Sequence, residues 1–94
     1  MYKVIVADNF HYMDESESYT SGEFSTLEEA IVKCKKIVNR FLKSAYQSGM
    51  SSEELYESYT LFGDDPYIAT ENVFSAWTYA KKRCVQICAS KRKT

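Results

Sequence analysis

Residues 25–47, STLEEAIVKCKKIVNRFLKSAYQ, decide the fold class of this chain. Ser25 and Glu28 have the spacing of a capping box, in which the hydroxyl and the carboxylate each bond a backbone amide of the first turn. The stretch predicts a long amphipathic helix over residues 26–47, which Gly49 would end. Its apolar residues recur at steps of three and four, as one helix face requires: Leu27, Ala30, Ile31, Cys34, Ile37, Val38, Phe41, Leu42 and Ala45.

A second, shorter helix is predicted directly after the first. Ser51 and Glu54 repeat the capping-box spacing, and Gly63 is a suitable stop. The sequence Asp64-Asp65-Pro66 then has the composition of a turn. Because proline suits the first residue of an edge strand, we expect a short strand over residues 67–70. The apolar face of the second helix consists of Leu55, Tyr56, Tyr59 and Phe62.

The third helix is predicted from residue 72 to about Ala89. Asn72 is a residue type that caps helices, and the apolar positions behind it are spaced for one helix face. Residues 90–94 are expected to form a disordered basic tail. The apolar positions of this helix are Val73, Phe74, Trp77, Ala80, Cys84, Ile87 and Cys88.

Two strands are predicted before the first helix. Residues 2–7 contain the β-branched run Val4-Ile5-Val6, which favours a buried strand. Residues 19–24 resume an extended pattern, and Gly22 indicates a bulge or an edge position there. The chain is therefore predicted to be one α+β domain over residues 1–94, of element order β-β-α-α-β-α. The helices would pack on one face of a small antiparallel sheet, where their apolar sides are buried.

The 94 residues hold 12 basic and 13 acidic side chains, which gives a net charge of −1. This balance provides no global attraction to nucleic acid or to anionic lipid. The charges alternate in blocks along the chain, two acidic and two basic, and we expect folding to bring opposite blocks together. The first residues do not resemble a signal peptide, and no apolar run approaches the length of a membrane span. We therefore expect a cytoplasmic protein.

Acidic residues surround the only histidine of the sequence. Asp8, His11 and Asp14 are spaced by three, and Asp64 and Asp65 are adjacent further on. Carboxylates and an imidazole can bind a ligand or move a proton. The alternative is a solvated histidine and an ordinary turn. A ligand site formed by these five residues requires the two acidic segments to converge in the fold.

Cysteine usage points to reduced thiols. Cys34, Cys84 and Cys88 are an odd number without the spacing of a disulfide framework. Together with His11 the three cysteines would supply the four ligands of a structural zinc site. Zinc motifs, however, place cysteines two to four residues apart on a turn, whereas Cys84 and Cys88 lie on a predicted helix. All three thiols fall on predicted apolar helix faces, where cysteine packs as a small hydrophobe. We expect core packing, with no metal and no cofactor.

Two surface features suggest binding. Lys81-Lys82-Arg83 and Lys91-Arg92-Lys93 could contact phosphates, although bases at a helix C-terminus also suit the helix dipole. The sequence contains eight tyrosines, more than a small core needs, and exposed tyrosine is favoured at interfaces. The favoured interpretation is a non-enzymatic module that binds a protein partner or associates with itself as a homodimer. A small enzyme or ligand-binding protein centred on His11 and nucleic-acid binding through the basic helices are the alternatives.

Three segments together resemble a family of small uncharacterised bacterial proteins. They are residues 6–15, VADNFHYMDE, residues 62–68, FGDDPYI, and residues 74–80, FSAWTYA. The resemblance would extend over nearly the whole chain. It implies a bacterial cytosolic protein, and it assigns no activity, cofactor or site residue to this sequence.

Overall fold

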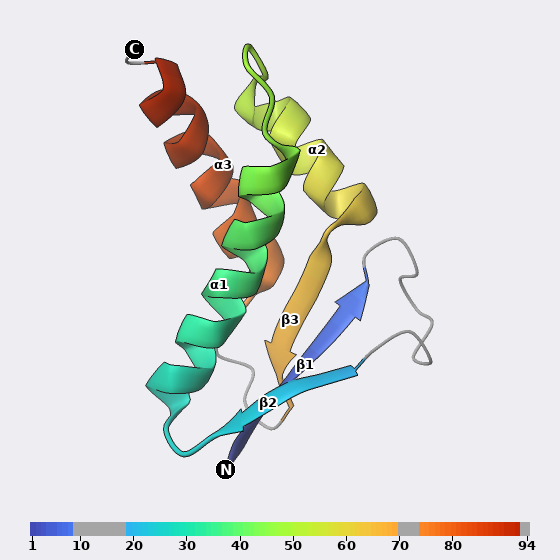
Figure 1. Cartoon of the computed structure of the whole chain (residues 1–94), viewed down its shortest axis with the longest axis vertical. Helices are drawn as coiled ribbons and strands as arrows, with labels where there is room; N and C mark the ends of the chain where they lie inside the picture. The colour runs from blue at the N-terminus through green and yellow to red at the C-terminus, as the bar shows by residue number, and fades with distance from the viewer. Residues whose placement is uncertain (9–18, 70–73, 93–94) are drawn as a thin grey trace.

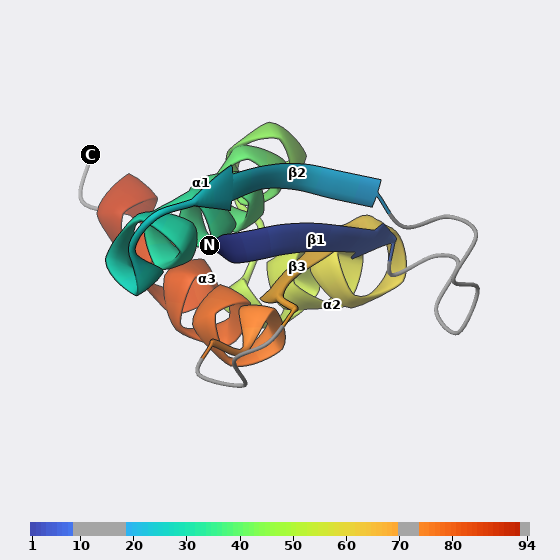
Figure 2. The ribbon, with the colours of Figure 1, turned by 90° about the horizontal axis from the view of Figure 1, so that it is seen from below.

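The computed structural model describes residues 1–8, 19–69 and 74–92. The elements follow in the order β1 (Tyr2–Asp8), β2 (Tyr19–Phe24), α1 (Leu27–Ala45), α2 (Ser52–Phe62), β3 (Asp64–Ile68) and α3 (Ala76–Arg92). The predicted α+β class and its element order are confirmed. In Figure 1, α1 and α3 run side by side. Figure 2 views the molecule from below, with the strands in front of α1 and α2.

The sheet is antiparallel and has the order β2-β1-β3. The β-branched run of β1 therefore occupies the centre, and Val4 and Val6 are buried. On one side Val4 pairs with Gly22 and Ile5 pairs with Thr20, so that the register shifts by one residue within β2. This irregularity adjoins Gly22 in an edge strand, as the sequence indicated.

The third strand begins earlier than expected. Residues 64–66, which were expected to form a turn, are the first residues of β3, and Pro66 pairs with Val6. The amide of Ala69 donates to the carbonyl of Lys3 at 3.0 Å. Since backbone groups alternate sides along a strand, the nitrogen of Pro66 faces the free edge of the sheet. Proline is tolerated there because β1 needs no hydrogen bond from that position.

The first helix is capped one residue later than its sequence suggested. Thr26, not Ser25, is the N-cap, and its hydroxyl accepts the amide of Glu29 at 3.2 Å. Both hydroxyls donate to the Glu29 carboxylate, at 2.9 Å from Thr26 and 3.2 Å from Ser25. The expected pairing of Ser25 with Glu28 is therefore wrong, because the carboxylate three residues after the true cap takes that place. At the other end the helix stops at Ala45, and Gly49, with φ of 86°, belongs to the turn that follows.

The second capping box is confirmed, whereas the third helix is shifted. The Ser51 hydroxyl accepts the amide of Glu54 at 3.2 Å, and the Glu54 carboxylate accepts the amide of Ser51 at 3.0 Å. Before α3, the Ser75 hydroxyl accepts the amide of Thr78 at 3.3 Å, which is the geometry of an N-cap. Asn72, the expected cap, lies outside the described residues. The helix continues to Arg92, so residues 90–92 do not form the expected disordered tail.

The buried residues form two clusters, and α1 contributes to both. The sheet cluster is formed by strand residues and one side of α1, and it contains Val4, Val6, Ala30, Cys34, Ile37 and Ile68. The helix cluster joins all three helices and contains Val38, Leu42, Leu55, Tyr59, Ala76, Ala80, Cys84, Ile87 and Cys88. The apolar face of α3 therefore packs mainly on α1 and α2, while α1 links the helices to the strands.

The aromatic residues are distributed differently from the expectation. Tyr59 is fully buried, and its ring contacts Phe41 and Trp77 edge-on at centroid distances of 5.9 and 6.4 Å. Phe62 was expected in the core, yet it is 59% exposed at the last residue of α2. Within the described residues, no helix is both long and apolar enough to cross a lipid bilayer.

Candidate functional site

A groove lies between α1 and the end of the sheet where β2 and β3 begin. Its cavity volume is about 260 Å³. In Figure 1, α1 and β2 diverge from the short connection at residues 25–26 that joins them. The lining side chains come from α1, β2 and β3 and are Tyr19, Ser21, Lys33, Ile37, Arg40, Phe41, Ser44 and Asp64.

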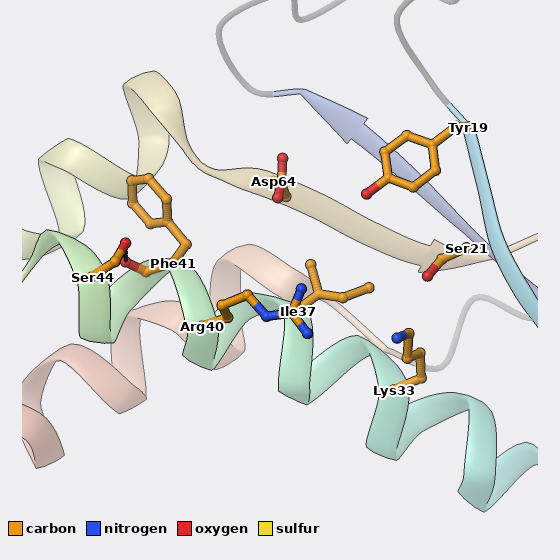
Figure 3. A pocket seen from close by; sticks show the side chains of 8 residues that line it. All are labelled: Tyr19, Ser21, Lys33, Ile37, Arg40, Phe41, Ser44 and Asp64. Atoms are coloured by element: carbon orange, nitrogen blue, oxygen red, sulfur yellow. Dashed lines mark hydrogen bonds between the residues drawn. The ribbon is translucent and has the colours of Figure 1, made fainter.

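Two cations of α1 dominate the helix side of the groove. Lys33 and Arg40 are seven residues apart, which places them on the same side of the helix, about 10 Å apart along its axis. In Figure 3, Lys33 lies across the groove from Ser21 and Tyr19, whereas Arg40 lies farther along α1, on the side of Asp64. Ile37 forms an apolar floor between the two cations. This arrangement suits an anionic group attached to an apolar one.

A second hollow continues from the first along α1 and β2. It has a cavity volume of about 330 Å³ and shares Lys33 with the groove. Val32, which is 50% exposed, and the half-buried Phe24 make it partly apolar. Two acids stand at its far end, on the first turn of α1. The lining residues are Phe24, Glu28, Glu29, Val32, Lys33 and Lys36.

The sequence-predicted acidic residues converge only in part. The backbone register places Asp8 directly opposite Asp64, and Asp65 opposite Ala7. The two acidic segments therefore meet at one end of the sheet, and Asp64 lines the groove. His11 and Asp14 lie outside the described residues. Burial raises the pKa of the Asp65 carboxyl, because the low-dielectric surroundings disfavour its charged form.

The three cysteines have no chemical role in this site. All are free thiols buried in the two clusters, with Cys34 0% exposed and Cys84 1% exposed. Desolvation raises the pKa of both thiols to about 11, so neither is a thiolate nucleophile at neutral pH. Core packing of the cysteines, as predicted, is confirmed. Among the described residues no group of three or more histidine, cysteine or carboxylate side chains could hold a metal ion.

Lys33 and Arg40 were not predicted from the sequence to be functional residues. Each fills the polar side of an amphipathic helix, where lysine and arginine are ordinary. Their seven-residue spacing was visible, but nothing in the local pattern shows that β2 lies opposite. The signal exists only once the strand and the helix are placed together.

No protein-family model, curated protein or solved structure matches this chain. The function is therefore argued from the geometry of the groove.

Proposed function

We propose that this chain is a non-enzymatic protein-binding module that holds an acidic segment of its partner in the groove between α1 and β2. The observation that carries the proposal is the pair Lys33 and Arg40 above a partly apolar floor. In the described part of the chain, neither cation forms a hydrogen bond or an ion pair with another residue. Both are therefore available to a carboxylate from outside.

Binding fits this site better than catalysis. A nucleophile with an adjacent base is the minimum that covalent catalysis requires. Among the described residues, none of the three hydroxyls that line the groove, those of Tyr19, Ser21 and Ser44, is hydrogen-bonded to a lysine or a carboxylate, and that of Ser44 donates to the carbonyl of Phe41. The hydroxyls and the two cations instead supply hydrogen bonds and charge without chemical change. A bacterial, cytosolic setting remains the expectation from the sequence.

A peptide titration tests the proposal. The probe is the acetylated and amidated peptide Val-Thr-Glu-Thr-Glu-Thr, and its uncharged counterpart carries Gln in place of Glu. We expect the Glu peptide to bind about tenfold more tightly, since each of two exposed ion pairs contributes about 0.5–1 kcal/mol. Calorimetry or backbone-amide NMR shifts would measure the two affinities.

The matched variants remove two charges each. Lys33→Gln combined with Arg40→Gln is expected to abolish the preference for Glu over Gln. Lys43→Gln combined with Lys82→Gln changes exposed lysines that do not line the groove, and it should leave the preference intact. Equal losses in both pairs, or no binding of the Glu peptide, would contradict the proposal.

The same samples separate the two other candidate functions. Helices α1 and α3, which carry the basic blocks, are packed against each other, and α3 also packs against α2, which belongs to an acidic block. If single-stranded DNA binds more tightly than the Glu peptide and the control pair weakens that binding, the protein recognises nucleic acid instead. If sedimentation shows a dimer that the groove variants dissociate, the occupant is a second copy of this chain.

A further inference from the structure

The two edges of the sheet differ in their ability to accept another strand. Pro66 turns its nitrogen toward the free edge of β3, so this edge lacks a donor at its centre. In β2, Glu23 is the Cα partner of Lys3, whose carbonyl points away from β2 and accepts the amide of Ala69. By alternation the amide and carbonyl of Glu23 therefore face the free edge. Such unpaired groups are a template for strand addition.

Two hollows border β2 where it faces α1. One is lined by Tyr19 and Ser21 and the other by Phe24, at opposite ends of β2, and α1 forms the wall of both. A strand of six residues spans about 20 Å, and Lys33 belongs to both hollows. The two hollows therefore adjoin each other at Lys33, between α1 and β2.

We infer that the partner segment binds as an additional β-strand, antiparallel to β2 along its free edge. The inference rests on the proposed function and specifies the conformation of the ligand. Main-chain hydrogen bonds to β2 supply affinity, and alternate side chains of the segment face α1 and supply specificity. The antiparallel direction is favoured because its ladder is the more stable one per residue.

The charges along α1 determine the order of side chains in the segment. Glu28 and Glu29 stand beside Phe24, and they repel an acidic side chain at that end. The other hollow contains two cations, Lys33 and Arg40, beside the single carboxylate of Asp64, and these cations attract acidic side chains there. The N-terminus of a segment antiparallel to β2 lies near Phe24. The segment should therefore begin with an apolar residue, near Phe24 and Val32, and continue with acidic residues at alternate positions.

The register shift in β2 is compatible with this arrangement. It lies at Ser21, between the pairs Val4–Gly22 and Ile5–Thr20. Bulges bend a strand and redirect a side chain, often beside a binding site, and Ser21 lines the groove. The added strand is expected to make its regular hydrogen bonds at Glu23, on the unbulged half of β2.

Three peptides test the strand geometry. The first is the acetylated and amidated Val-Thr-Glu-Thr-Glu-Thr, the second is the same sequence in reverse order, and the third is the first peptide with N-methyl groups on alternate amides. We expect the reversed peptide and the N-methylated peptide each to bind at least tenfold more weakly. On binding of the first peptide, the amide of Glu23 should become protected from hydrogen exchange.

The possible outcomes distinguish this inference from the proposed function. If all three peptides bind equally and still depend on Lys33 and Arg40, side chains alone hold the segment and the strand inference is wrong. If the Glu23 amide is not protected by the bound first peptide, the inference is also wrong. If the Glu peptide does not bind at all, the proposed function itself fails.

Discussion

At the scale of single residues, Tyr59 connects the helix cluster to the sheet. Its ring is completely buried among aromatic neighbours, and its hydroxyl donates to the carbonyl of Asp64 at 2.7 Å. This bond joins α2 to the first residue of β3. A buried hydroxyl needs such a partner, so one side chain both fills the core and positions the start of an edge strand.

Removing only this hydroxyl should weaken the fold without emptying the core. We expect Tyr59→Phe to lower the free energy of unfolding by about 1–2 kcal/mol. Tyr59→Ala should cost about 3–5 kcal/mol, because it also leaves a cavity. Urea unfolding measures both values. Tyr56→Phe, at a half-buried position, is the control, and an equal loss in that control would contradict a special role for Tyr59.

A second prediction at this scale concerns Asp65 and pH. Because its pKa is raised by burial, the folded protein keeps this proton at pH values where the unfolded chain has lost it. Stability therefore falls as the pH rises from the ordinary value of 3.8 through the folded pKa. Asp65→Asn should be more stable than the parent at pH 7, and the difference should vanish below that ordinary value. Glu57→Gln, at an exposed position on α2, serves as the control, and urea midpoints against pH provide the measurement.

At the scale of elements, polar side chains fix how α1 and α3 meet. The Asn39 amide group donates to the hydroxyl of Tyr79 at 3.0 Å and accepts from Nε of Arg83 at 2.8 Å. Lys35 places its ammonium 5.5 Å from the centre of the Tyr79 ring. These contacts specify one register between two helices whose apolar faces alone would tolerate sliding.

The contribution of this contact can be measured by a double-mutant cycle. Asn39→Ala and Arg83→Ala should be non-additive, with a coupling of about 1 kcal/mol, because the two side chains share a hydrogen bond. The comparison is the pair Arg83 and Gln86, whose side chains form a hydrogen bond of 2.7 Å within α3. This pair should show a smaller coupling energy because its hydrogen bond is exposed to solvent. Additive effects for Asn39 and Arg83 would mean that the contact contributes nothing.

The N-cap of α2 offers a further prediction at this scale. Ser51→Ala removes the hydroxyl that accepts the Glu54 amide, and we expect a loss of about 1 kcal/mol. Ser52→Ala removes only an exposed bond to its neighbour Glu53 and should change stability little. Thermal unfolding of the two variants makes the comparison, and equal losses would contradict the assigned cap.

At the scale of the whole molecule, α1 determines whether the protein unfolds in one step. One side of this helix packs on the sheet cluster and another on the helix cluster. A single helix that belongs to both clusters couples them, and domains of this size usually unfold cooperatively. The thiols report on the clusters separately, because Cys34 lies in the first and Cys84 and Cys88 lie in the second.

We therefore expect all three cysteines to become reactive together. Iodoacetamide labelling at increasing urea, followed by mass spectrometry, should give one midpoint for Cys34 and Cys84. Below the transition the reaction should be slow, because both thiols are buried and protonated. Labelling of Cys34 at lower urea would show instead that the sheet opens before the helices.

Local patterns in the sequence were sufficient for the elements and their order. The capping pair Ser51–Glu54 and the apolar spacing from Leu27 to Ala45 involve residues only three or four apart in the chain. Such patterns can therefore be recognised before the fold is known. The same reasoning failed at Phe62, which has the spacing of a core residue but stands at a helix end. It also failed at Asp64-Asp65-Pro66. These residues have the composition of a turn, but they begin β3 because β1, which is distant in the sequence, pairs with them.

The sequence alone therefore determined which segments are helices or strands and that the cysteines are buried, because periodicity and capping act over a few residues. Only the tertiary structure decided that Asp8 lies opposite Asp64 and that Lys33 and Arg40 share a groove with β2. Those relations join residues distant in the chain, and they depend on how the strands pair and how α1 crosses them. A binding site is made of such long-range relations, so it emerges only when the elements are packed.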